Sequence, residues 1–231
     1  MSKLAIIPAR GGSKRIPRKN IKSFLGKPII AYSIEMAIKS GTFDEVMVST
    51  DDEEIAEIAR EYGATVPFIR SKSTSGDFAT TADVIEEVLN EYASNGNHVD
   101  LACCIYPTAP LINADKIMES FELLKTQSFD CVFPVVEYSY PIQRALKVNE
   151  QKHMDLFFKE NKNARSQDLI KSYHDAGQFY SFLVDEFIKS KQLWTENTGV
   201  IVLNELEVQD IDTLTDWKLA ELKYELLQSI K

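Results

Sequence analysis

Short apolar runs alternate with helix-patterned segments along most of this chain, and this alternation restricts its fold more than any other feature. Six runs have the length and composition of buried strands: 4–8, 46–49, 101–106, 131–136, 178–184 and 200–203. Four segments between them carry apolar residues at helical spacing: 28–40, 53–62, 80–92 and 115–125. We therefore predict an α/β fold, a three-layer doubly wound sheet that is mostly parallel and binds its ligand at the carboxyl ends of its strands.

The alternation is interrupted between residues 138 and 177. This stretch is polar and lacks a clean period, and its segment 160–162 is strongly charged. Excursions of this kind from a wound sheet often form a flap or a dimerisation arm. We predict one domain over 1–231, with 138–177 as an inserted flap or dimerisation region and an amphipathic helix at 214–227 closing the fold.

Charge is distributed unevenly along the chain. The net charge is −9, yet the first 34 residues contain eight of the 26 basic residues and none of the 35 acidic ones. An acidic protein with one basic segment is a poor candidate for binding nucleic acid, which usually requires an extended basic face. It is a good candidate for binding one compact polyanion, such as a nucleoside triphosphate. The alternative is a solvated charged loop, which the neighbouring glycines and strand disfavour.

The first residues and the cysteines indicate a cytoplasmic protein. The opening apolar run breaks at once into glycine and charge, which is typical neither of a signal peptide nor of a membrane span. Cys103, Cys104 and Cys131 all lie in apolar, strand-like stretches without metal-ligand spacing. We expect reduced core thiols and no membrane partner.

A basic, glycine-containing segment, Ala9–Asn20, follows the first predicted strand directly. Gly11 and Gly12 would let backbone N–H groups approach phosphate oxygens closely. Lys14, Lys19 and the neighbouring arginines can add charge-assisted hydrogen bonds. The segment matches neither the P-loop nor the dinucleotide-binding pattern. It predicts a phosphate-binding loop of another type.

Asp210 and Asp212 form the second chemical motif. Alternate residues of an extended segment point to opposite faces, but a turn or bulge can direct both carboxylates to one ion. Their hard oxygen ligands suit Mg²⁺, which could bridge the carboxylates and a triphosphate. The alternative is that Asp212 or Asp216 caps the helix that follows. A basic phosphate loop elsewhere in the chain favours the metal.

The string IPARGGSKRIPRKN at 7–20 resembles the signature of the acylneuraminate cytidylyltransferases, which make CMP-activated sialic acids. Four further segments resemble family motifs in the same order: 48–51, Arg70 with Thr80-Thr81, 107–111 and 210–213. The resemblance covers essentially the whole chain. It implies a nucleotide-diphospho-sugar transferase-like fold, CTP and a nine-carbon acidic sugar as substrates, Mg²⁺, and a homodimer in which each insert reaches the other subunit's site.

The resemblance also implies roles for individual residues. The implied catalytic residues are Arg10, Lys14, Lys19, Asp210 and Asp212, of which the two aspartates would hold the metal. The implied nucleotide contacts are Arg10, Gly11, Gly12, Ser13, Lys14, Asn20, Arg70, Ala79 and Thr81. Arg70 and the backbone at Ala79 would contact cytosine, and Asn20 and Thr81 the ribose. For Arg70, the alternative is a surface arginine at the end of a strand.

Two segments, 140–146 (YPIQRAL) and 174–180 (HDAGQFY), resemble the branch of the family that activates pseudaminic acid. Members acting on N-acetylneuraminate usually have Gln where this chain has Tyr106, and Asn where it has Asp175-Ala176. The implied sugar contacts are Tyr106, Gln143, Arg144, Asp175 and Gln178. Arg144 would pair with the sugar carboxylate. The alternative is that these residues hold the insert together.

The predicted function is therefore the conversion of CTP and pseudaminic acid into CMP-pseudaminic acid and pyrophosphate. The anomeric hydroxyl would attack the α-phosphorus, with positioning and charge neutralisation as the main catalytic effects. The alternatives are activation of N-acetylneuraminate or legionaminic acid, a nucleotidyltransferase for sugar 1-phosphates, and an inactive nucleotide-binding scaffold of the same fold. A Rossmann oxidoreductase is disfavoured because its glycine fingerprint is absent from the sequence.

Overall fold

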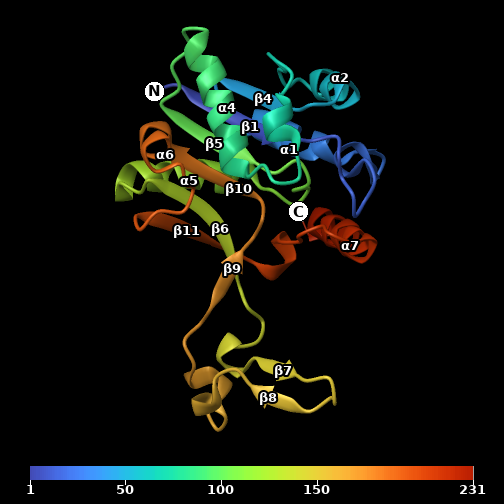
Figure 1. Ribbon diagram of the computed structural model, residues 1–231, viewed down its shortest axis with the longest axis vertical. Helices are drawn as coiled ribbons and strands as arrows, with labels where there is room; N and C mark the ends of the chain where they lie inside the picture. Colours follow the sequence, from blue (N-terminus) through green and yellow to red (C-terminus); the bar gives the residue numbers. More distant parts are fainter. Residues whose placement is uncertain (231) are drawn as a thin grey trace.

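The computed structural model describes residues 1–230, and its centre is a seven-stranded sheet covered by helices (Figure 1). Six strands follow the order β11–β6–β10–β5–β1–β4, and β9 pairs with β6 outside this path. The strands are β1 (Lys3–Pro8), β4 (Glu45–Ser49), β5 (Leu101–Ile105), β6 (Cys131–Glu137), β9 (Tyr173–Asp175), β10 (Phe179–Leu183) and β11 (Thr198–Leu203). Each of the six segments predicted from the sequence forms one of them.

The sheet is mixed: five of its seven strands run in one direction, in line with the prediction of a mostly parallel sheet, whereas β9 and β10 run in the other. β1 is parallel to β4 and β5, and β11 is parallel to β6, but β10 is antiparallel to both of its neighbours. A parallel connection requires a crossover, usually a helix. The stretch 138–177 forms no α-helix. The chain therefore returns through β9, antiparallel to β6, and enters β10 in the reverse direction.

Helices cover both faces of the sheet, as the sequence predicted. On one face lie α1 (Ile29–Lys39), α2 (Glu53–Glu61) and α5 (Ala114–Gln127), and on the other α4 (Thr81–Ser94) and α6 (Val184–Ser190). Because alternate strand residues point to opposite faces, Ala5 and Ile7 of β1 pack in the first layer, whereas Leu4 and Ile6 pack in the second. Because the strands are packed on both faces, the positions of their ends are fixed, and so are the starting points of the loops that follow them.

The C-terminal helix, α7 (Leu214–Ile230), packs against the segment that follows β1 (Figure 1). Its Trp217 lies edge-on to Phe24, with ring centroids 5.6 Å apart. Phe24 belongs to a small hairpin of β2 (Ser23–Phe24) and β3 (Lys27–Pro28). This aromatic contact holds the residues just before α7 beside the basic loop.

Between β6 and β9 the chain forms an arm, defined here as residues 138–172, that projects from the sheet (Figure 1). It contains a hairpin of β7 (Leu146–Val148) and β8 (Met154–Leu156), together with three short 3₁₀ turns. None of its residues is buried, and the side chains of Tyr140 and Ile170 are 85% and 83% exposed. In a single copy of the chain, the arm therefore has no hydrophobic core.

The cysteines lie in the core, and the helices are those of a protein without a helical membrane span over the described residues. The three cysteines are free and buried in the sheet, and burial raises the pKa of Cys103 to about 12, so this thiol is unreactive. Over residues 1–230, no helix is both long enough and apolar enough to span a membrane.

Candidate functional site

A cavity of about 400 Å³ opens where β1 and β5 end. Its lining includes nine of the residues that the sequence singled out: Arg10, Ser13, Lys14, Lys19, Asn20, Arg70, Ala79, Thr81 and Tyr106. Parallel strands place their carboxyl ends at one edge of a sheet, and this edge is where α/β proteins usually bind ligands. The fold therefore gathers residues from three separate chain segments, 8–20, 70–84 and 106–108, into one site.

The two glycines of the basic loop differ in what they do. The N–H group of Gly11 donates to the Asp51 carboxylate at 2.9 Å, and a Cβ on Gly11 would lie 2.7 Å from Oδ2 of Asp52. A Cβ on Gly12 would meet open space. Neither glycine has a left-handed φ. Close packing against Asp52 therefore explains Gly11, whereas nothing in the structure requires glycine at position 12.

Asp52 is itself held in place by two kinds of contact. It caps α2 by accepting from the Ile55 N–H at 3.0 Å, and it accepts from Nη2 of Arg18 at 2.9 Å. The hydrogen bond from Arg18 lowers the pKa of Asp52, so this carboxylate stays ionised. Arg18 thus ties the basic loop to α2.

Gly11→Ala is expected to lower the free energy of unfolding by about 1–2 kcal/mol, because Asp52 must give up its cap or its ion pair to admit the new methyl group. Gly12→Ala is the matched control and should leave stability unchanged or slightly raised. Urea unfolding of both variants measures the difference. Equal stability of the two would contradict this assignment.

The cations Arg10 and Lys14 share one acidic partner that the sequence analysis missed. Nη1 of Arg10 donates to Oδ1 of Asp77 at 3.0 Å, and Lys14 pairs with the other oxygen of the same carboxylate. The hydrogen bond from Lys14 lowers the pKa of Asp77. Asp77 follows Gly76 in the turn before α4, and only this turn signal, directly ahead of the Thr80-Thr81 motif, could have pointed to it.

Lys19 connects the basic loop to the segment before α7. Its Nζ donates to the Ile211 carbonyl at 2.8 Å. Burial lowers the pKa of Lys19, and the nearby charges of Asp212 and Asp210 oppose this effect. The next residue, Asn20, is buried and donates from Nδ2 to the Arg10 carbonyl at 2.9 Å, which fixes the backbone at the start of the loop.

Asp210 and Asp212 lie on either side of the buried Ile211, and both act electrostatically on Lys19. Asp212 also pairs with Arg15. Thr213, rather than Asp212, caps α7: its Oγ1 accepts from the Asp216 N–H at 3.2 Å, and the Asp216 carboxylate accepts in return from the N–H groups of Asp212 and Thr213 at 3.1 and 2.7 Å. The alternative role of Asp212 as the helix cap is therefore wrong.

The carboxylates of Asp210 and Asp212 suit a metal ion that takes few of its ligands from the protein. Within residues 1–230, no three His, Cys, Asp or Glu side chains are grouped so that they could hold an ion. Two carboxylates with oxygens from a bound triphosphate are the set that Mg²⁺ commonly takes. Asp210 and Asp212, facing the basic loop through Lys19, fit such an ion.

Arg70 is not a surface arginine, since only 6% of it is exposed. Its Nε donates to Oγ of Ser49 at 2.9 Å, and its Nη2 donates to the Ser49 carbonyl. Burial lowers its pKa, and no carboxylate of residues 1–230 forms a salt bridge with it. Buried charges are usually paired or hydrogen-bonded, so a guanidinium with spare donors in a cavity lining is suited to a polar ligand.

The predicted sugar contacts are not all gathered in the cavity. Tyr106 lines it, but Asp175 is engaged elsewhere: one oxygen accepts from the Gly177 N–H at 2.7 Å, and the other from the Tyr180 hydroxyl. Gln178 is buried and donates from Nε2 to the Glu207 carbonyl at 2.6 Å. In a single copy of the chain, Asp175 and Gln178 therefore stabilise the structure around β10.

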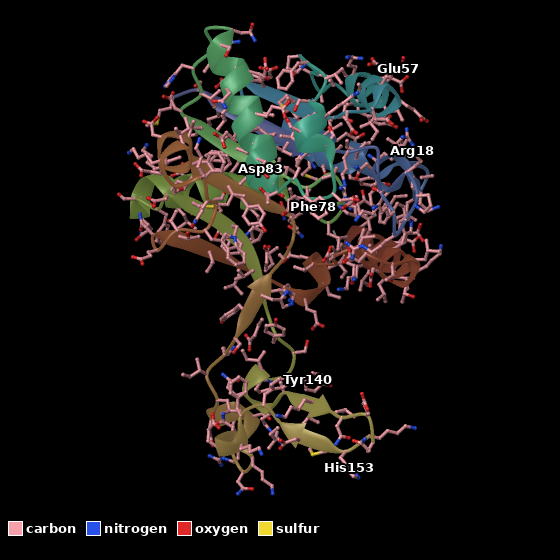
Figure 2. All side chains as sticks on the ribbon, viewed as in Figure 1. Arg18, Glu57, Phe78, Asp83, Tyr140 and His153 are labelled. Carbon is pink, nitrogen blue, oxygen red and sulfur yellow. The ribbon has the colours of Figure 1, made fainter. Side chains whose placement is uncertain are left out.

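Gln143 and Arg144 lie on the arm, away from the cavity. Gln143 donates from Nε2 to the Ile170 carbonyl at 2.8 Å, which closes the base of the arm. Arg144 lines a second cavity, within the arm itself, together with Tyr140 and Lys159. Figure 2 shows Tyr140 and His153 on this projection, well separated from Phe78 beside the first cavity. The chain alone does not bring these two residues to the site.

The chain matches one protein-family model and is similar in sequence to several known proteins. A family model described as cytidylyltransferase matches residues 4–197. A pseudaminic acid cytidylyltransferase of Campylobacter jejuni is 45% identical over 98% of this chain and 97% of its own length. A CMP-N,N'-diacetyllegionaminic acid synthase of Legionella pneumophila is 32% identical over 97% of both chains.

Two solved structures share the fold. A CMP:2-keto-3-deoxy-manno-octonic acid synthetase complexed with CTP gives a TM-score of 0.69 at 17% identity, over 99% of this chain and 100% of that one. A 4-diphosphocytidyl-2C-methyl-D-erythritol synthase from Anaerococcus prevotii gives 0.63 at 13% identity, over 97% and 98%. At these identities the likeness concerns the fold alone, an α/β architecture with a mixed central sheet.

Proposed function

Because this chain belongs to the cytidylyltransferase family, we propose that it converts CTP and pseudaminic acid into CMP-pseudaminic acid and pyrophosphate. One observation carries the choice of sugar: the 45% identity to the C. jejuni enzyme over nearly the full length of both chains. The legionaminic acid relative is less similar, at 32%. The segments 140–146 and 174–180 support the same choice.

In this reaction the anomeric hydroxyl of the sugar attacks the α-phosphorus of CTP. A new bond forms between that oxygen and phosphorus, the bond to the β-phosphate oxygen breaks, the hydroxyl loses its proton and pyrophosphate leaves. Arg10, Lys14 and Lys19 hold the phosphates and neutralise the developing charge. Arg70 and the Ala79 backbone contact cytosine.

The remaining nucleotide contacts come from the loop and from the start of α4. Ser13 and the backbone at Gly11 and Gly12 surround the phosphates, while Asn20 and Thr81 lie toward the ribose. Asp210 and Asp212 hold Mg²⁺, which supplies further positive charge to the phosphates when it is bound. The proposed location is the cytoplasm, where buried free thiols persist.

We further propose that the chain is a single domain over 1–231 whose insert, 138–177, serves as a dimerisation arm. The arm lacks buried side chains and exposes Tyr140, Phe157 and Ile170, and exposed apolar groups of this kind usually mark an interface. In a homodimer, the arm would carry Gln143 and Arg144 to the sugar site of the partner. Arg144 would then pair with the sugar carboxylate.

Deletion of 140–171 is expected to give a folded monomer with little activity. The cut is compatible with the fold, because the Tyr138 N–H donates to the Ser172 carbonyl at 2.9 Å, so two glycines can join the ends. Light scattering measures the mass, and pyrophosphate release measures the activity. Arg144→Gln is the control: it should remain dimeric and raise the KM for the sugar. A fully active dimer from the deletion variant would refute the proposed arm function.

Pyrophosphate release with each of the four ribonucleoside triphosphates, Mg²⁺ and pseudaminic acid tests the reaction. Turnover with CTP alone is expected. Turnover only with a sugar 1-phosphate and another triphosphate would indicate the other class of nucleotidyltransferase. Thermal stabilisation by CTP without any turnover would indicate an inactive scaffold.

A further inference from the structure

Asp77 lies among the cations that we assign to the phosphates of CTP. Its carboxylate contacts Arg10 at 3.0 Å and pairs with Lys14, and all three residues line the 400 Å³ cavity. The hydrogen bond from Lys14 keeps the pKa of Asp77 low, so the group is an anion at neutral pH. An internal carboxylate therefore occupies the position that a ligand phosphate would take.

The loop that carries Asp77, residues 71–80, begins with a helical turn, α3 (Lys72–Ser75), and is tied to α4 at both ends. At one end, the Ser71 N–H donates to Glu87 of α4 at 2.7 Å, and the Thr74 hydroxyl donates to the same carboxylate. At the other, Thr80 and Asp83 form a reciprocal capping box at the start of α4. Between them, Phe78 is 98% exposed (Figure 2). Residues 76–79, which include Asp77, can therefore move while α3 and the start of α4 stay in place.

The same loop is flanked by the groups assigned to the nucleoside. Arg70 precedes it, Ala79 lies in it and Thr81 follows it, and all three line the cavity. A nucleotide can contact these groups while its phosphates replace Asp77 at Arg10 and Lys14. Free pyrophosphate can only compete with Asp77, because it has no base or ribose to offer.

We propose, on the basis of the CTP reaction above, that Asp77 is an internal counter-anion that competes with phosphate groups for Arg10 and Lys14. It lowers the affinity of the site for CTP and for pyrophosphate by a similar factor. CTP offsets this cost through its base and ribose contacts, whereas pyrophosphate has no such contacts. After each transfer, the return of Asp77 to Arg10 and Lys14 helps to expel pyrophosphate.

Asp77→Asn tests this proposal, because it removes the charge and keeps the size of the side chain. The two ion pairs are exposed and individually weak, so we expect the Kd for pyrophosphate, measured by calorimetry without Mg²⁺, to fall about threefold to tenfold. The Kd for CTP should fall by a similar factor, because its phosphates displace the same carboxylate, whereas the Kd for cytidine, which carries no phosphate, should change by less than about twofold. The product-inhibition constant of pyrophosphate should fall with its Kd.

Glu57→Gln is the matched control, because it removes the same charge from an exposed position on α2, away from the cavity (Figure 2). It should change none of these Kd values. Unchanged or weaker pyrophosphate binding by Asp77→Asn would overturn the proposal, as would an equal gain for pyrophosphate and cytidine. Binding is measured here without turnover. A protein that binds both ligands but transfers nothing would therefore refute the proposed reaction and leave the Asp77 result to be decided separately.

Discussion

Replacing Lys19 by methionine is expected to lower kcat/KM for CTP by about 100-fold to 1,000-fold, the usual cost of losing one preorganised charged donor at a reacting centre. The ammonium lines the cavity and donates to Ile211, so it lies between the phosphate loop and the segment of Asp210 and Asp212. Methionine keeps the apolar stem of the side chain and removes the charge together with the hydrogen bond to Ile211. Steady-state pyrophosphate release measures the effect.

Lys22→Met is the matched control for this variant. Lys22 lies just after the basic segment, and its Nζ is 5.7 Å from the ring centroid of Trp217, outside the cavity lining. Its loss should change kcat/KM by less than about threefold, since an exposed cation–π contact is weak. Equal losses from both substitutions would contradict a specific role for Lys19.

The lowered pKa of Lys19 adds a dependence on pH. Burial favours the neutral amine, so this side chain loses its proton at a lower pH than an exposed lysine does. As pH rises through that lowered pKa, Lys19 loses the positive charge that it directs at the phosphates. The alkaline fall of kcat/KM should therefore begin below the range of an ordinary lysine, and it should be absent in Lys19→Met.

The double variant Asp210→Asn with Asp212→Asn is expected to lose about 1,000-fold in kcat, because a bound metal contributes several kcal/mol of charge stabilisation in such reactions. Its residual rate should no longer respond to the Mg²⁺ concentration. A titration of Mg²⁺ against the rate, and against CTP binding, measures both effects.

Arg15→Met separates the metal role from a structural one. Asp212 pairs with Arg15, so the loss of Arg15 breaks this pair and leaves both carboxylates in place. The variant should keep its response to Mg²⁺ and most of its kcat. If it lost as much activity as the double aspartate variant, the two carboxylates would serve to hold Arg15 rather than a metal.

Local patterns in the sequence predicted the strands and helices well, but not every strand direction. The run at 178–184 appears as β10, Phe179–Leu183, close to its predicted bounds. Its antiparallel direction depends on the absence of a crossover helix before it, in a segment that was interpreted only as an insert. Strand existence is a local property, whereas strand direction depends on the whole connection.

The site was predictable where it follows strand ends, and less so where it depends on side-chain pairing. Arg10 and Tyr106 come directly after β1 and β5, so the order of strands was enough to bring them together. The contact of Asp77 with Arg10 arises from the path of a loop that has no periodic pattern. Gln143 and Arg144 lie on the arm, where their hydrogen bonds go to Ile170 and Ser166 rather than into the cavity.

The most direct test of the central claim is kcat/KM with CTP and Mg²⁺, measured side by side for pseudaminic acid, legionaminic acid and N-acetylneuraminate. We predict efficient pyrophosphate release with pseudaminic acid, and rates at least about 100-fold lower with the other two, since a site built to hydrogen-bond one sugar rejects analogues whose polar groups do not match. Efficient turnover with legionaminic acid or N-acetylneuraminate, and none with pseudaminic acid, would contradict the account.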